Sequence, residues 1–184
     1  GVLAEIRASL KGKAMLSVVA GYTNEKYRPL VDESVRVQYI MPNTPCLVGA
    51  GMLLFESTNS LEAGERAEIM NLFRALGRVT EMPSHLMGIG GAVSGCGPAF
   101  SAMVIEALAD AGVKYGVPRA TAYRLASATL MGTGKMQLEA KTGFLGIACQ
   151  RLPQGVVTGV FRVNARVHAD AAVIMTVPFF HHPA

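Results

Sequence analysis

The residues best suited to chemistry in this sequence form a glycine-rich segment near its middle. Residues 87–97 contain five glycines, and Pro98 follows directly. A stretch without side chains lets a ligand reach the backbone, and the first N–H groups of a helix attract a carboxylate or phosphate. We therefore expect a turn over residues 88–97, a helix that begins at Pro98, and a ligand contact where the two meet. Close packing of helices accounts for such glycines at least as well, so that alternative stays open.

The loop Pro42-Asn43-Thr44-Pro45 is the second candidate. Its two prolines restrict the backbone, and it follows an alternating, β-rich run over residues 35–41. Open α/β sheets bind ligands beyond the ends of their strands, and the Asn43 and Thr44 side chains could hydrogen-bond a nucleotide sugar or amide. An ordinary turn explains the same four residues.

Nucleophilic and metal chemistry find little support in the residues. The sequence has no G-x-S-x-G elbow, and its four histidines form no triad pattern, so Ser94 is interpreted as a helix cap. Cys46, Cys96 and Cys149 lie far apart without a C-x-x-C pair, which indicates neither a disulfide framework nor a zinc site. We expect no metal and assign no catalytic residue.

Composition narrows the classes of protein. Hydrophobic residues make up 51% of the 184 residues and charged residues 16%, which excludes a disordered chain and allows a buried core. The net charge of +4 is scattered singly, so nucleic acid is not an expected partner. No signal peptide opens the chain, and the apolar run over 171–180 is too short to span a bilayer. We expect a soluble, cytoplasmic protein that does not bind membranes.

The elements that must position these residues alternate between helix and strand as far as Pro83, as in an open α/β sheet. The clearest pattern is an amphipathic helix over 60–76, with Asn59 or Ser60 as N-cap. Its apolar side is Ile69, Leu72, Phe73 and Leu76. The remaining spacing predicts a helix over 2–10 and strands over 14–21, 35–41, 51–56 and 78–82.

After Pro83 the composition shifts to Ala, Gly and Met, and two helices are predicted over 98–115 and 118–140. The first is apolar on most of its circumference, so we expect an obligate partner chain and a symmetric dimer. Residues 143–184 contain no Lys and no Glu, and they lose the helical periodicity. The predicted division is therefore 1–83, 84–142 and 143–184, with no fold assigned to the last segment.

Several motifs in one uninterrupted order over residues 2–142 resemble the pyrroline-5-carboxylate reductase family. The matching stretches are LKGK and SVVAG within 10–21, MPNTP at 41–45, LG at 76–77, SGCGPAF at 94–100, EALADAGV at 106–113 and KM at 135–136. Several motifs in register are more specific than any single glycine pattern.

The resemblance implies α/β plus all-α architecture: the C-terminal part of a Rossmann-type NAD(P)-binding domain, then a helical dimerisation domain. It implies an oxidoreductase of proline biosynthesis that acts on a C–N bond, reducing 1-pyrroline-5-carboxylate to L-proline with NADPH or NADH, as a homo-oligomer. The cofactor-binding residues carried over are Ala20, Gly21, Asn43 and Thr44. The substrate-binding residues carried over are Ser94, Gly95, Gly97 and Pro98.

The sequence also departs from the family pattern. It contains no G-x-G-x-x-G turn for the pyrophosphate, no H-P-G or S-P-G-G-T segment after Gly143, and Gly88 and Gly91 stand where the family carries Asp and Thr. We therefore expect an incomplete copy with severely weakened cofactor binding and a tail that is not homologous to the family. The alternatives are a non-catalytic subunit or pseudoenzyme fragment that only oligomerises, and a different dehydrogenase of the β-hydroxyacid type.

Overall fold

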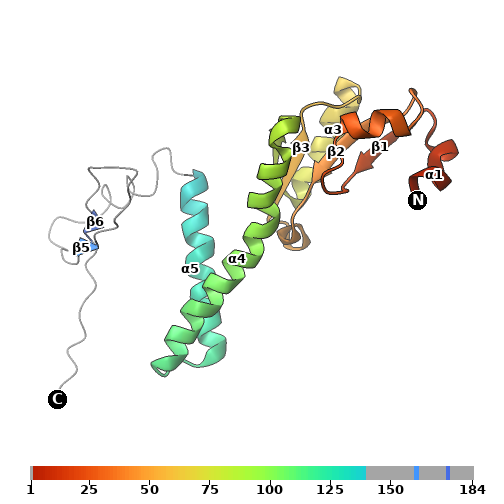
Figure 1. Cartoon of the computed structure of the whole chain (residues 1–184). Coiled ribbons are helices and arrows are strands. Elements are labelled where there is room, and N and C mark those ends of the chain that lie inside the picture. Colours follow the sequence, from red (N-terminus) through yellow and green to blue (C-terminus); the bar gives the residue numbers. More distant parts are fainter. Residues whose placement is uncertain (1, 140–159, 162–172, 175–184) are drawn as a thin grey trace, which may run out of the picture. The chain divides into compact units, whose positions relative to one another are not determined.

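The computed structural model describes residues 2–139, 160–161 and 173–174. The chain divides into two compact units, residues 1–111 and residues 112–184. The first unit holds a four-stranded sheet, the helices around it and most of the long helix α4 (Figure 1). The second holds α5 and a short strand pair.

The sheet has the strand order β1-β2-β3-β4. Its strands are β1 (Ala14–Ser17), β2 (Arg36–Met41), β3 (Gly51–Glu56) and β4 (Gly77–Met82). β1 and β2 run parallel, β2 and β3 antiparallel, and β3 and β4 parallel. The four predicted strands are confirmed, but β1 ends at Ser17 rather than Gly21. The Ser17 Oγ accepts a hydrogen bond from the Val19 N–H at 3.3 Å, which turns the chain out of the sheet.

The helices of the first unit connect and cover the strands. They are α1 (Val2–Ile6), α2 (Asn24–Tyr27), α3 (Ala63–Phe73) and α4 (Met87–Lys114). Short 3-10 helices are η1 (Arg7–Leu10), η2 (Arg28–Leu30), η3 (Thr44–Val48), η4 (Arg74–Leu76) and η5 (Ser84–Leu86). In the second unit α5 (Arg119–Glu139) confirms the predicted helix over 118–140, and β5 (Val160–Phe161) pairs antiparallel with β6 (Val173–Ile174).

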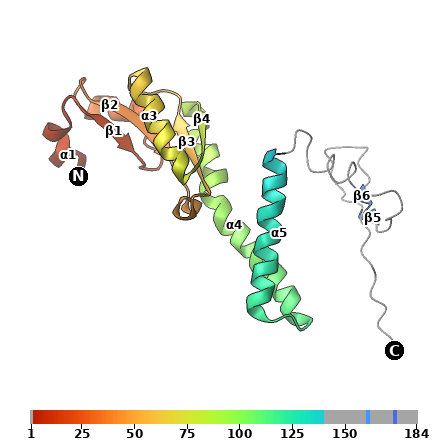
Figure 2. The ribbon, with the colours of Figure 1, turned by 180° about the vertical axis from the view of Figure 1, so that it is seen from behind.

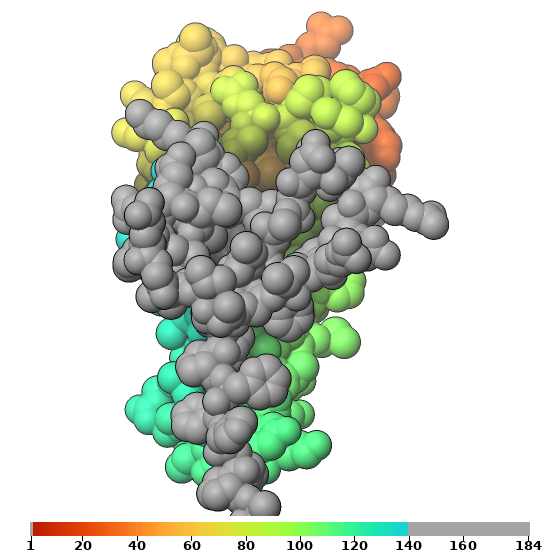
Figure 3. Space-filling view, turned by 90° about the vertical axis from the view of Figure 1, so that its left-hand side faces the viewer, coloured from red at the N-terminus to blue at the C-terminus, as the bar shows by residue number. Residues whose placement is uncertain are grey.

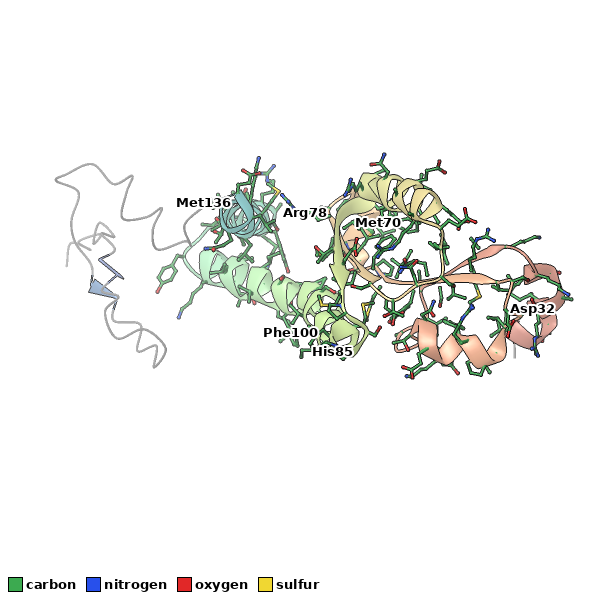
Figure 4. The ribbon with its side chains drawn as sticks, turned by 90° about the horizontal axis from the view of Figure 1, so that it is seen from above. Asp32, Met70, Arg78, His85, Phe100 and Met136 are labelled. Carbon is green, nitrogen blue, oxygen red and sulfur yellow. The ribbon has the colours of Figure 1, made fainter. Side chains whose placement is uncertain are left out.

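Alternation along the strands places two apolar clusters on opposite faces of the sheet. On one face Tyr39 and Leu54 pack with Met87 at the start of α4. On the other face the neighbouring residues pack against α3, in the cluster Ile40, Leu53, Phe55, Ile69, Met70 and Phe73. The two ribbon views from opposite sides show α3 and the start of α4 exchanging front and back (Figures 1 and 2). Seen from above, Met70 and His85 lie on either side of the strands (Figure 4).

The amphipathic helix is shorter than its sequence pattern predicts. α3 begins at Ala63, after a Glu62 N-cap that makes no side-chain capping bond, so neither Asn59 nor Ser60 caps it. Leu72, assigned to the apolar side, is 70% exposed, whereas Met70 packs on the sheet. The helix is rotated so that Phe73 meets the ring of Phe55 edge-on, with centroids 5.6 Å apart.

The predicted turn over residues 88–97 is wrong, because these residues are helical and α4 begins at Met87. A Cβ on Gly90 would lie 3.0 Å from Leu54 Cδ1 and from Met82 Cε, and one on Gly91 would overlap the Met41 side chain. Small residues at these two positions let α4 approach the sheet closely, as the packing interpretation proposed. In the space-filling view the segment that follows β4 forms a yellow-green surface beside the yellow surface of α3 (Figure 3).

Candidate functional site

A pocket of about 520 Å³ opens near the carboxyl ends of the parallel strands β1 and β2. Its lining comes from the segment after β1, from α2, from β2, from η5 and from the first turn of α4. These residues are Ala20, Gly21, Thr23, Lys26, Tyr39, Met41, Ser84, Met87 and Gly88. Open α/β sheets bind their ligands in this place, because loops and helix starts converge beyond the strand ends.

Gly21 forms a turn at this pocket with a left-handed backbone. Its φ is +75°, and the position that a Cβ would take has no heavy atom within 4 Å. The Gly21 N–H donates to the Tyr39 hydroxyl at 3.0 Å, and the Gly21 carbonyl accepts from Lys26 Nζ at 2.6 Å. Because Tyr39 is buried in β2, its hydroxyl is fixed in place. Side chains from β2 and α2 therefore hold both polar groups of an otherwise flexible residue.

A buried carboxylate fixes the start of α2, which follows this turn. Glu56, at the end of β3, is fully buried, and its Oε2 accepts from the Asn24 N–H at 2.7 Å. The Asn24 side-chain amide donates to the Val37 carbonyl at 2.9 Å. Two central strands thus hold the helix that carries Lys26, and the geometry of the pocket depends on the sheet rather than on the loop alone.

The Asn43 side chain is occupied by backbone groups and does not line the pocket. Its Nδ2 donates to the Ser94 carbonyl at 2.9 Å, and its Oδ1 accepts from the Met52 N–H at 2.8 Å. Thr44, the first residue of η3, is exposed. Of the four residues carried over for the cofactor, the structure brings Ala20 and Gly21 into the pocket.

The four residues carried over for the substrate lie inside α4 and not at its start. Ser94 is seven positions after Met87 and therefore is not a helix cap, and Pro98 is an interior residue rather than the first. The Ser94 Oγ is buried and has no hydrogen-bond partner among the described residues. The helix start that lines the pocket is formed by Met87 and Gly88.

Sequence reasoning missed Tyr39, Lys26 and the first turn of α4. The signal for Tyr39 is present in the strand pattern, since it lies two residues before Met41 and so shares its face of β2. No comparable signal marks Lys26, because α2 is only four residues long and its position is set by the buried Glu56.

The two carboxyl groups whose pKa is lowered, those of Asp32 and Glu65, do not line this pocket. Hydrogen bonds from the Ser34 side chain and N–H lower the pKa of Asp32. The hydrogen bond from Arg36 lowers the pKa of Glu65, and the same pair raises the pKa of Arg36. In the described part of the chain no group of three or more His, Cys, Asp or Glu is placed to hold a metal ion. Cys46 and Cys96 are free thiols, and Cys149 lies outside the described residues.

A second pocket, of about 560 Å³, lies between α1 and the segment after β1. Its lining is mostly apolar and includes Val2, Leu3, Val19 and Leu30. No residue of β2 or α4 lines it, so the first pocket, which lies at the ends of the parallel strands, is the better candidate for a polar ligand.

The long helix carries an extensive exposed apolar surface. Within the described residues, the stretch 84–114 is long and apolar enough to cross a membrane by length and composition. Its large exposed side chains are Leu86, Ile89, Val93, Phe100, Met103, Val104 and Leu108. On α5 the exposed ones are Leu125, Met131, Met136 and Leu138. Phe100 and Met136 are labelled in Figure 4. Such faces are typical of helices that meet another chain or a membrane.

Comparison with known proteins identifies relatives over both regions of the chain. The family model for pyrroline-5-carboxylate reductase dimerisation matches residues 84–149. The pyrroline-5-carboxylate reductase of Synechocystis is 40% identical over 139 residues, covering 73% of this chain and 52% of that protein. The Escherichia coli K12 protein of that name is 37% identical over 139 residues, covering 75% of this chain and 52% of that protein. The Corynebacterium melassecola protein is 32% identical over 186 residues, covering 92% and 69%. The chain therefore spans about half the length of the first two relatives.

Solved structures show the same fold. Plasmodium falciparum pyrroline carboxylate reductase with NADP bound gives a TM-score of 0.72 at 30% identity, covering 85% of this chain and 63% of that one. The Coxiella burnetii pyrroline-5-carboxylate reductase gives a TM-score of 0.73 at 25% identity. The match covers 84% of this chain and 58% of that one. The arrangement of a Rossmann-type sheet followed by long helices is common to all three.

Proposed function

Because this chain belongs to the pyrroline-5-carboxylate reductase family, we propose that it takes part in the NAD(P)H-dependent reduction of 1-pyrroline-5-carboxylate to L-proline, in proline biosynthesis. The reaction adds a hydride to the carbon of a C=N bond and a proton to its nitrogen. The observation that carries the proposal is the pocket beyond the carboxyl ends of β1 and β2, where such sheets bind ligands. The cofactor is NADPH or NADH.

Ala20 and Gly21 form the surface offered to the nicotinamide end of that cofactor. A planar ring can approach Gly21 because no heavy atom lies within 4 Å of its missing side chain. The bound dinucleotide supplies the hydride. The chain's own contribution is position: Tyr39 and Lys26 hold the Gly21 N–H and carbonyl, so the surface is set before binding.

The substrate side of the site is formed by α4. Met87 and Gly88 of its first turn line the pocket, and the Met87 N–H already donates to the Ser84 carbonyl, so that amide is not free for the substrate carboxylate. Ser94 offers a buried hydroxyl that has no partner among the described residues. Ser94, Gly95, Gly97 and Pro98 stay proposed substrate contacts on the resemblance alone, as Asn43 and Thr44 do for the cofactor, because none of the six lines this pocket.

The proposal includes a homo-oligomer that forms through the helices. Support comes from the dimerisation model matched over 84–149 and from the exposed apolar side chains of α4 and α5. A second copy that covers these side chains accounts for the apolar stretch over 84–114 without a bilayer. We place the protein in the cytoplasm, with domains over 1–83 and 84–142 and a separate segment over 143–184.

Binding of NADPH to matched glycine variants tests the cofactor site. Gly21 and Gly12 share a left-handed backbone, with φ of +75° and +71°, and both have open space where a Cβ would lie. Alanine therefore strains both positions alike, by roughly 1 kcal/mol. We expect Gly21→Ala to raise the Kd for NADPH about tenfold, since its new methyl occupies the ring surface. Gly12→Ala should leave the Kd unchanged.

Two outcomes of NADPH-binding and turnover measurements on the unmodified chain would contradict the proposal or redirect it. If the unmodified chain neither binds NADPH nor oxidises it in the presence of 1-pyrroline-5-carboxylate, the reductase proposal fails for this polypeptide. If it still forms dimers in that case, the non-catalytic oligomerisation subunit is the correct function. That alternative is favoured by one observation: the family model that matches is the dimerisation model.

A further inference from the structure

Pro98 removes one hydrogen bond from the middle of α4. In an α-helix each N–H donates to the carbonyl four residues earlier, and proline has no N–H. The carbonyl that would accept from residue 98 is that of Ser94, and α4 continues through both residues as one helix. A helix carbonyl with no donor is costly unless another group supplies one.

The side chain of Asn43 supplies that donor from a different element. Its Nδ2 lies 2.9 Å from the Ser94 carbonyl oxygen, and its Oδ1 lies 2.8 Å from the Met52 nitrogen. The orientation of the amide is unambiguous, because the Ser94 carbonyl can only accept and the Met52 N–H can only donate. One side chain thus joins the loop after β2, the start of β3 and the middle of α4.

We propose that Asn43 is a positioning residue, which fixes the loop after β2 to α4 by supplying the donor that Pro98 lacks. Both elements continue into the pocket, through Met41 on one side and the first turn of α4 on the other. The bridge therefore sets the separation of the two sides proposed for cofactor and substrate. Its meaning for catalysis rests on the proposed function, but the bridge itself can be tested without any ligand.

A double-mutant cycle in the full chain isolates this interaction. Asn43→Ala leaves both the Ser94 carbonyl and the Met52 N–H unpaired, and should raise the equilibrium constant for unfolding about thirtyfold. Pro98→Ala provides an N–H that can bond to the Ser94 carbonyl. In the Pro98→Ala background, Asn43→Ala should then raise the equilibrium constant for unfolding by a factor about fivefold smaller. Urea unfolding followed by circular dichroism measures both constants.

Asn59 provides the matched control. Its amide also bridges two backbone groups, donating to the Ser57 carbonyl at 3.0 Å and accepting from the Leu61 N–H at 3.0 Å, but both partners are two residues away in a local turn. The effects of Asn59→Ala and Pro98→Ala should add without coupling. Additive effects for Asn43→Ala and Pro98→Ala would overturn the proposal.

A spectroscopic reading distinguishes the bridge from general packing. The carbonyl ¹³C resonance of Ser94 should shift on Asn43→Ala and return when Pro98→Ala is added, which a packing role would not produce. If Asn43→Ala does not fold, Pro98→Ala alone gives the answer. Competition from the new N–H should speed solvent exchange of the Asn43 side-chain amide protons, and unchanged exchange would refute the bridge.

NADPH titration of the unmodified chain keeps the two proposals apart. Absence of NADPH binding contradicts the proposed function, and the coupling and the Ser94 resonance still decide the role of Asn43. Binding by the unmodified chain together with equal binding by Asn43→Ala would show that the bridge does not position the site.

Discussion

Single residues at the pocket owe their geometry to partners far away in the sequence. Gly21 is held by Tyr39, eighteen residues later, and Asn24 is held by Glu56, thirty-two residues later. The sequence pattern predicts a strand as far as Gly21, whereas the structure has a turn there that is held by a phenol in the next strand. A glycine without such bonds would lose more conformational freedom on binding a ligand.

The Arg36–Glu65 ion pair should make the stability of the folded protein depend on pH. Arg36 Nε and Nη2 donate to the two oxygens of Glu65 at 2.9 and 3.1 Å, which lowers the pKa of that carboxyl. The folded state therefore binds fewer protons than the unfolded state between the two pKa values. This contribution to stability is complete above the unfolded pKa and is lost as pH falls through the folded pKa.

Replacing Glu65 by glutamine should accordingly flatten the acid side of the stability curve. The measurement is the free energy of unfolding in urea at a series of pH values from neutral to acid. Asp32 also has a lowered pKa, so part of the acid dependence should remain. Glu68→Gln, on the exposed side of the same helix, serves as control and should give the slope of the unmodified protein. Equal slopes for Glu65→Gln and the control would refute the assignment.

Among the elements, α4 shows why glycine patterns are ambiguous. Five glycines before a proline are typical of a turn, yet here they are helical because Gly90 and Gly91 permit close contact with Leu54, Met82 and Met41. The contact area gained against the sheet outweighs the low helix propensity of glycine. The start of α4, which lines the pocket, is consequently at Met87 and not at Pro98.

Two glycines near α3 should respond to alanine in opposite directions. Gly77 begins β4 with φ of +148°, and a Cβ there would overlap the backbone of its strand partner Gly51. Gly77→Ala should lower the free energy of unfolding by roughly 3 kcal/mol. Gly64 lies in α3 with no atom within 4 Å of its missing Cβ, so Gly64→Ala should raise stability by about 0.5–1 kcal/mol. Urea unfolding measures both, and a tolerated Gly77→Ala would contradict the close strand pairing.

For the molecule as a whole, the exposed apolar surface of α4 and α5 is the dominant feature. Monomeric proteins rarely expose so extensive an apolar surface, which is typical of an interaction site. The dimerisation model covers these helices, and the homo-oligomer is the partner we propose. The division at 83 and at 142, and the separate character of residues 143–184, remain predictions.

A charge on α4 should dissociate the oligomer. Phe100 is 65% exposed on α4, and Leu72 is 70% exposed on α3. Phe100→Glu should raise the dissociation constant of the dimer about a hundredfold, because a carboxylate would be buried at the contact without a partner. Leu72→Glu, of similar exposure but outside the region that the dimerisation model matches, should leave the dissociation constant unchanged. Light scattering after size-exclusion chromatography measures the molar mass of each variant. If Phe100→Glu is still a dimer, Phe100 does not lie in the dimer interface.

The sequence by itself determined the strand pattern, the change from an α/β region to a helical one, and the family. These depend on local periodicity and on motifs in register, which neighbouring residues encode. Tertiary structure decided that the glycine-rich segment is helical and that Tyr39 and Lys26 hold Gly21. It also decided that the Asn43 amide donates to the Ser94 carbonyl within α4. The reason is physical: a backbone group takes whichever partner the packed chain brings within about 3 Å, and that partner lies in another element.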